Sequence, residues 1–322
     1  MLKARDYIPA LKFGAKIMPE DIAGMIGLPS VGEIFYVDPG KSTSGGGKSA
    51  DDAFKTLTEA YAAISADNDD VVIIAPTSST GRTSEAAAIT WAKRRTHIIG
   101  NGPLRTGWNR AGVSFASTVS TPSFTVSATN CSFTNIIFAN FEDINVLVNV
   151  SAAYNTFNYC HFAGIANATT GADTAGRSLV ITNADDNHFN NCMFGVDTVL
   201  NSAANAQVEL IGTTACARTQ FNNCIWSGTG DDADIRFVLF TGNNSSEIYT
   251  LFRNCIFLNT RGTTTTMTVA MTVPGSTNGR VIMDNSWWLG CTDLCDVVTN
   301  VYTNNNVVAT ADAGVLIVHA NS

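Results

Sequence analysis

Eight acidic residues in the second half of the chain are the first candidates for catalysis. Cleavage of a glycosidic bond needs two carboxyl groups roughly 5–10 Å apart, and elimination chemistry needs an acidic calcium site beside a basic residue. Most of these acids lie in predicted turns, where solvated acids are common, and the two on predicted strands lie about two repeats apart. The set is Asp185, Asp186, Glu209, Asp231, Asp232, Asp234, Glu247 and Asp284. We therefore predict no catalytic residues.

A glycine-rich stretch resembles a phosphate-binding loop at first sight. Gly47-Lys48-Ser49 follows a predicted strand and precedes a predicted helix. The P-loop pattern requires a glycine five positions before Gly47, and the chain has Ser42 there. The strand that follows carries Asp70 before its apolar run rather than at its end. These departures argue against nucleotide binding.

Metal ligation is also not predicted, and no cofactor is expected. Cys291 and Cys295 are the one closely spaced pair of soft ligands, but no second Cys/His pair lies near them in sequence. The four histidines fall at different phases of the repeat described below, so we expect surface or turn positions for them. They are His97, His161, His188 and His319.

One short phrase recurs six times and organises the chain. It reads Phe-x-Asn-Cys-x-Phe with variations, and its first residues lie 24, 32, 32, 31 and 31 positions apart. A period of 20–50 residues is typical of stacked repeats. The phrases begin at Phe133, Phe157, Phe189, Phe221, Phe252 and Met283.

The bulky residues of each phrase stand at positions 1, 4 and 6. Positions 4 and 6 share one face of a strand, whereas position 1 breaks this parity, so we expect a bend near position 3. Parallel pairing of equivalent strands, about 4.8 Å apart, would stack like residues into internal columns. The predicted columns are Cys160, Cys192, Cys224 and Cys255, and Phe162, Phe194, Trp226 and Phe257. We expect the thiols in the first column to be buried and free.

The predicted fold is all-β: a right-handed, single-stranded parallel β-helix with an N-terminal capping helix and an extended N-terminal arm. A second apolar stretch before each phrase, such as Leu179–Ile181, supplies another strand per coil. We divide the chain into an arm (1–33), a strand plus cap helix (34–70), the β-helix (71–300) and a closing segment (301–322). The cap helix is expected from Ala50 to about Ala66, with Ser49 and Asp52 as a capping box.

The composition indicates which kinds of partner are not expected. Only 14% of the 322 residues are charged and the net charge is −8, so we do not expect nucleic acid as a partner. No run of 18 apolar residues is present, so no membrane span is expected. The start of the chain lacks the apolar core of a secretory signal.

Residues 1–33 carry more apolar side chains than so short a segment can bury alone. Pro9, Pro19 and Pro29 interrupt them. The arm either packs on its own β-helix or docks on another protein. The side chains assigned to such docking are Tyr7, Ile8, Leu11, Phe13, Ile17, Met18, Ile22 and Met25.

Two resemblances to known families follow from these segments. The passage Ile34-Phe-Tyr-Val-Asp-Pro39, a Gly/Ser loop, Ala53-Phe-Lys-Thr-Leu57 and Asp69-Asp-Val-Val-Ile-Ile74 resembles the opening of pectin-lyase-like β-helix proteins. The arm from Tyr7 to Met25 resembles the N-termini of β-helical structural proteins of tailed bacteriophages, among them head decoration or cement proteins. Tailspike proteins also join an N-terminal attachment segment to a β-helix.

The second resemblance implies a non-enzymatic virion protein, a capsid decoration protein whose arm binds the major capsid protein. It implies a location on the capsid surface after assembly in the bacterial cytoplasm, and a homotrimer. The alternative is a tailspike-type protein that binds or depolymerises a surface polysaccharide. A secreted adhesin is disfavoured by the missing signal and the free cysteine column.

Overall fold

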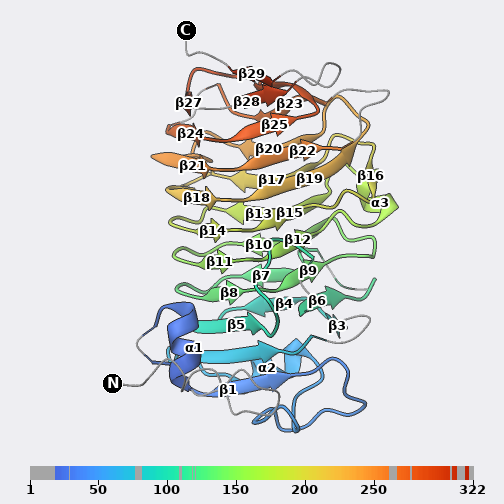
Figure 1. Ribbon diagram of the computed structural model, residues 1–322, viewed down its shortest axis with the longest axis vertical. Helices are drawn as coiled ribbons and strands as arrows, with labels where there is room; N and C mark the ends of the chain where they lie inside the picture. The colour runs from blue at the N-terminus through green and yellow to red at the C-terminus, as the bar shows by residue number, and fades with distance from the viewer. Residues whose placement is uncertain are drawn as a thin grey trace.

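The computed structural model describes residues 19–28, 30–76, 82–108, 111–117, 119, 121–260, 267–275 and 278–304, and the backbone of two further strands at 307–309 and 316–318. The chain winds into a rod of stacked coils, with strand β1 near one end and strand β27 near the other (Figure 1). Three long parallel sheets run along the rod. This confirms the predicted parallel β-helix.

Each regular coil contributes one strand to each sheet in turn. Sheet 1 consists of β1 (Ile34–Val37), β2 (Asp70–Ile74), β5 (Thr96–Gly100), β8 (Ser132–Thr134), β11 (Thr156–Asn158), β14 (His188–Asn190), β18 (Thr219–Asn222), β21 (Tyr249–Arg253), β24 (Arg280–Asp284) and β27 (Val301–Asn304). Sheet 2 consists of β4 (Ile89–Trp91), β7 (Phe124–Val126), β10 (Val146–Val150), β13 (Arg177–Thr182), β17 (Ala206–Ile211), β20 (Arg236–Thr241), β23 (Met267–Thr272) and β26 (Cys291–Cys295).

Sheet 3 consists of β3 (Arg82–Glu85), β6 (Gly112–Phe115), β9 (Ile137–Ala139), β12 (His161–Ala163), β15 (Met193–Phe194), β19 (Ile225–Gly230), β22 (Ile256–Asn259), β25 (Trp287–Leu289), β28 (Val307–Ala309) and β29 (Leu316–Val318), with β16 (Leu200–Asn201) beside β19. Helix α3 (Ala168–Gly171) lies in the turn between β12 and β13. The sequence phrases form the corner between sheets 1 and 3.

The repeated phrases lie in register, so like residues stack inside the rod. Phe157 pairs with Phe189 and Phe162 with Phe194, and the rings of these pairs are stacked with centroids 4.8 and 5.2 Å apart. The four column cysteines are fully buried free thiols, and each lies one coil above the last. Each fully buried aromatic side chain contributes about 1.5–3 kcal/mol of hydrophobic free energy. The columns are therefore the main stabilising feature of the fold.

The expected bend lies at position 3 of every phrase. The backbone there has positive φ in all six copies, at Asn135, Tyr159, Asn191, Asn223, Asn254 and Asn285. Asparagine tolerates this left-handed conformation better than most residues. Its amides also bond along the axis, as from Asn254 Nδ2 to Asn223 Oδ1 at 3.1 Å. The bend turns the chain from sheet 1 into sheet 3.

The N-terminal end is closed by helix α2 (Leu57–Ala63), whose Leu57 and Ala60 point into the core. The expected helix over 50–66 is too long, and the expected capping box is wrong. Thr56 is the N-cap, and its hydroxyl and the Glu59 carboxylate complete the box. Ser49 and Asp52 instead lie in a turn that precedes the helix. The Gly/Ser loop fills the intervening stretch and bonds to the free edge of β1, from Tyr36 N–H to Gly47 O at 2.8 Å.

Helix α1 (Pro19–Ile26) lies on the outer face of sheet 1 at the same end of the rod (Figure 1). Its Ile22 is buried against Val71, Ile73 and Ile99, with Ile26 packed beside it. This part of the arm therefore packs on its own β-helix. At the other end, β29 pairs antiparallel with β28, so the C-terminal apolar strand folds back on its own sheet.

Candidate functional sites on the flanks

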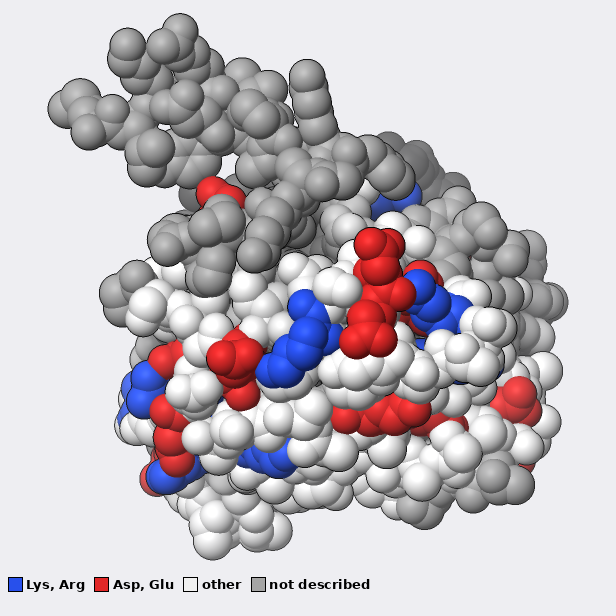
Figure 2. All heavy atoms as spheres, turned by 90° about the horizontal axis from the view of Figure 1, so that it is seen from below, with Lys and Arg blue, Asp and Glu red and all other residues white. Residues whose placement is uncertain are grey.

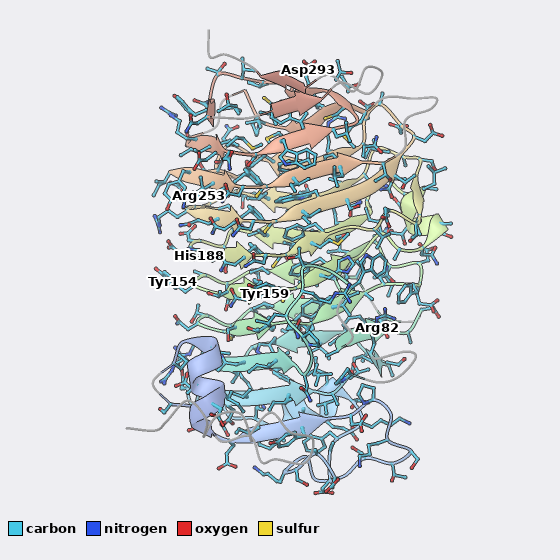
Figure 3. The ribbon with its side chains drawn as sticks, in the orientation of Figure 1. Arg82, Tyr154, Tyr159, His188, Arg253 and Asp293 are labelled. Carbon is cyan, nitrogen blue, oxygen red and sulfur yellow. The ribbon has the colours of Figure 1, made fainter. Side chains whose placement is uncertain are left out.

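The outer face of sheet 1 changes character along the rod. One outward row reads Ser132, Thr156, His188, Gln220, Leu251, Ile282 and Tyr302. The row is polar in the middle and apolar towards the C-terminal end, where Tyr302 is 51% exposed. Figure 3 shows His188 and Arg253 on this side of the molecule, with Tyr154 at the turn that leads into the sheet.

A shallow groove of about 450 Å³ crosses the C-terminal part of this face. Gln220 donates a hydrogen bond of 3.2 Å to the Tyr249 hydroxyl, and Arg253 pairs with Asp284 at 3.3 Å. Aromatic, amide and charged groups on one open surface are the groups that recognise sugars. The groove is lined by Gln220, Tyr249, Leu251, Arg253, Ile282, Asp284 and Asn304.

The turn acids fasten one coil to the next. Both Asp186 oxygens accept hydrogen bonds of 2.7 Å from the Arg218 guanidinium, and this pairing lowers the pKa of Asp186. Asp185 accepts from the Ala217 N–H at 2.7 Å. In the longer loop, Asp232 accepts from the Asp234 N–H, a local turn contact. These contacts give the acids a structural role.

The two strand acids are separated as expected, and both face outwards. Glu209 lies on sheet 2, where it accepts from Arg177 Nε at 2.7 Å and from the Thr241 hydroxyl at 2.6 Å. Asp284 lies on sheet 1. Because the two acids project from different sheets, they do not form the carboxylate pair that glycoside hydrolysis requires.

The glycine-rich loop does not form a phosphate cradle. The N–H groups of Gly45 and Gly47 donate to the carbonyls of Ala53 and Asp52, so both are already used. Lys48 pairs with Glu33 at 2.9 Å and lies over the Phe35 ring. Figure 2 shows basic and acidic side chains interspersed over this end of the rod. The N–H groups of Gly45 and Gly47 are therefore not available to bind a phosphate.

Two histidines are buried, contrary to the expected surface or turn positions. His161 on β12 is fully buried: its Nδ1 accepts from the Trp108 N–H at 3.0 Å and its Nε2 donates to Gly195 O at 2.9 Å. Burial holds the pKa of His161 at about 4, below the ordinary 6.5. His97 is 3% exposed and bonded to Ser132. His319 lies outside the described residues.

The loop 101–108 between β5 and β6 is what buries His161. It lies on the outer face of sheet 3, and the Trp108 ring meets the imidazole edge-to-face with centroids 5.0 Å apart. The sequence did not predict this contact, because the loop shows no strand periodicity. The one sequence feature that points to a turn is the glycine at position 107; Gly107 and Trp108 both have positive φ in the structure.

No group of three or more potential metal ligands exists among the described residues. Cys291 and Cys295 are both buried, and burial raises the pKa of Cys291 to about 12 and that of Cys295 to about 11. Burial also raises the pKa of Cys160 and Cys224 in the internal column. These side chains act as core residues.

The assigned docking residues of the arm divide into two groups. Ile22 is 1% exposed on its own sheet, so a partner cannot reach it, and its assignment to a docking surface is corrected. Met25 lies on helix α1. Six further members, Tyr7, Ile8, Leu11, Phe13, Ile17 and Met18, lie outside the described residues.

Comparison with known proteins supports the fold. No family model matches the sequence, and no curated protein matches it either. Among solved structures, a pectin methylesterase from Aspergillus niger superimposes with a TM-score of 0.54 at 17% identity, covering 86% of this chain and 85% of that one. A rhamnogalacturonan lyase superimposes with a TM-score of 0.50 at 14% identity, covering 80% and 74%. At these identities the likeness shows the fold alone.

The chain is therefore a right-handed parallel β-helix of the kind found in polysaccharide-processing enzymes. Its two strand acids, Glu209 and Asp284, lie on different sheets and do not form a catalytic pair. Among the described residues, no helix is both long and apolar enough to cross a lipid bilayer.

Proposed function

We propose that this protein is a non-enzymatic structural protein of a bacteriophage particle, a capsid decoration protein attached through its N-terminal arm to the major capsid protein. The observation that carries the proposal is the way the arm joins the rod. Helix α1 is fixed on sheet 1 by Ile22 and Ile26, and residues 1–18 precede it in the sequence. Their sequence resembles the N-termini of phage head proteins.

The packing of helix α1 on sheet 1 suits a protein that must stay bound to a capsid under mechanical load. A load on the arm would pass into β2 and β5 of sheet 1, because Ile22 packs on Val71 and Ile73 of β2 and on Ile99 of β5. Those strands continue into the aromatic columns that bind the coils together. The Asp186–Arg218 and Glu209–Arg177 pairs also favour a structural role, because they engage the acids that catalysis would need.

Deletion of residues 1–18 tests the anchoring role. The truncated protein keeps helix α1 and the cover over sheet 1, so it is expected to fold as the full chain does. We expect it to lose co-sedimentation with empty capsids, whereas Tyr302→Ala at the opposite end of the rod keeps it. Undiminished capsid binding by the truncated protein would refute the proposal.

The groove on sheet 1 favours a second candidate, a surface polysaccharide as ligand. Tyr249 offers an aromatic face and Arg253 with Asp284 offers directional hydrogen bonds. If a glycan binds here, Tyr249→Ala and Arg253→Ala should each weaken retention of the protein on host capsular polysaccharide, and Tyr154→Ala should not. Clearing of a capsulated lawn by the purified protein would instead indicate a depolymerase.

A further inference from the structure

From β6 onwards, sheet 3 differs from the other two sheets in charge; its first strand, β3, carries Arg82 and Glu85. None of its strands β6, β9, β12, β15, β19, β22 and β25 contains an Asp, Glu, Lys or Arg residue. Sheet 1 carries Arg253 and Asp284 over the same part of the rod, and sheet 2 carries Arg177, Glu209 and Arg236. A long uncharged face is unusual on a chain whose net charge is −8.

The outward row of this sheet is apolar apart from His161. In register it reads Ile137, His161, Met193, Ile225, Ile256 and Trp287. The first three are all buried: His161 and Met193 lie beneath the loop 101–108, whereas Ile137 packs with Ala139, Ala163 and Val196. That loop fits closely, since a Cβ atom at Gly107 would overlap the sulfur of Met193.

Further along this face, towards the C-terminal end, the outward side chains are partly exposed. Ile225 and Ile256 are half-buried, and Trp287 is 37% exposed while its neighbour Trp288 points into the core. Leu258 and Leu289 lie beside them on β22 and β25 and are also half-buried. We call Ile225, Ile256, Leu258, Trp287 and Leu289 the C-terminal strip. Strands β19, β22 and β25 lie one above another in Figure 1, so the strip is continuous.

We propose that the C-terminal strip is a self-association surface that packs against a second copy of this chain. Two copies that each carry a net charge of −8 repel one another, so they meet at least cost where no charge must be desolvated. A symmetric interface also brings like residues close together, which uncharged side chains tolerate and single-signed charges do not.

The composition of the strip fits the same occupant. Aromatic and large aliphatic residues form the buried centre of homomeric interfaces, and charged residues are depleted there. The apolar surface continues onto the covering loop, whose Leu104 and Trp108 are 54% and 39% exposed. Trp287 is the largest side chain of the strip, so we expect it to contribute most to binding.

The mass of the full chain in solution tests this. We expect sedimentation and light scattering, across roughly a hundredfold range of concentration, to give a multiple of the 34.1 kDa chain mass. Trp287→Glu places a charge in the strip and should give the single-chain mass, with a thermal midpoint that no longer rises with protein concentration. The control Tyr302→Glu adds the same charge on sheet 1 and should keep the multiple.

Three results would overturn the proposal: a single-chain mass for the unaltered protein throughout, an unchanged mass for Trp287→Glu, or a soluble glycan that binds the strip of a single chain and is lost in Trp287→Glu. If Trp287→Glu fails to fold, Trp287→Ser replaces it. We then expect the dissociation constant for self-association to rise by at least about tenfold. An unchanged dissociation constant would count against the proposal. The capsid-binding test of residues 1–18 is separate, so either idea can fail alone.

Discussion

Glu85 and Leu57 join the first coil to the helix that closes it. The Leu57 N–H donates a hydrogen bond of 2.8 Å to the Glu85 carboxylate, which also accepts from the Thr58 N–H and hydroxyl. A carboxylate at a helix N-terminus is stabilised by the free N–H groups and the helix dipole. At the other end of the helix, Lys93 Nζ donates to the carbonyls of Tyr61 and Ile64 at 2.6 and 2.7 Å.

Glu85→Gln should therefore destabilise the protein by about 1–3 kcal/mol, because the buried amide cannot satisfy the three donors as a carboxylate does. Urea unfolding followed by circular dichroism measures the change in the free energy of unfolding. Glu142→Gln, which removes a partly exposed acid from another turn, is the control and should shift it by less than about 0.5 kcal/mol. Equal losses for the two variants would show that the hydrogen bonds from α2 to Glu85 do not contribute more than an ordinary surface contact.

Acidification should loosen the contact between His161 and the loop 101–108. Folding lowers the pKa of His161 from 6.5 to about 4, so the unfolded chain binds the proton more tightly. The contribution is complete above pH 6.5 and is lost as the pH falls from 6.5 to 4, by about 3 kcal/mol in total. The proton would force a second N–H towards the Trp108 N–H donor.

His161→Gln should flatten this part of the stability curve. Urea unfolding at several pH values between 7 and 4 gives the slope for the unaltered protein and the variant. His188→Gln, on the outer face of sheet 1, controls for loss of a histidine elsewhere and should keep the original slope. Parallel curves for all three proteins would contradict the assignment.

The aromatic columns should dominate stability. Phe189 is fully buried and stacks between Phe157 and Phe221 with centroids 4.8 and 4.9 Å away. Phe189→Ala leaves a cavity in a column that cannot close, so we expect a loss of about 3–5 kcal/mol in the free energy of unfolding. Phe141→Ala, at a 46% exposed ring, should cost far less. A loss below about 1 kcal/mol for Phe189→Ala would refute the importance of stacking.

Position 3 of the phrase offers a stabilising change. Tyr159 holds φ +53 where the other five copies have asparagine. Tyr159→Asn should raise the thermal midpoint, corresponding to about 0.5–1 kcal/mol, because asparagine tolerates the left-handed conformation better. The reciprocal Asn191→Tyr should lower it. A lower midpoint for Tyr159→Asn together with a higher one for Asn191→Tyr would show that side-chain contacts outweigh the backbone at this bend.

The repeat was legible in the sequence because each phrase obeys the same local rule. Stacking forces equivalent positions into equivalent surroundings, so Phe162, Phe194 and Trp226 could be placed from spacing alone, and a bend or bulge near position 3 followed from the broken parity. The cap helix was misplaced because two capping boxes compete in sequence. Thr56 with Glu59 prevails over Ser49 with Asp52, since Leu57 and Ala60 can then enter the core and Glu85 can reach the helix N-terminus.

Features that join distant, non-repeating segments were not legible. His161 and Trp108 are 53 positions apart, and Ile22 meets Val71 and Ile99 across different elements. Nothing periodic links these partners, so the buried histidine and the docking of α1 appear only once the coils are stacked. The C-terminal strip of sheet 3 is likewise visible only when the path of loop 101–108 is known.

Because the phrases repeat in register, whole coils can be removed from or added to the rod without changing the packing of the others. Excision of Phe221–Leu251, one 31-residue period, would join Gln220 directly to Phe252. Phe189 would then meet Phe252, and Cys192 would meet Cys255, with each residue finding a neighbour of the same kind. Since a coil contacts only the coils on either side of it, evolution can shorten or extend such a rod by whole turns while leaving helices α1 and α2 at its N-terminal end untouched.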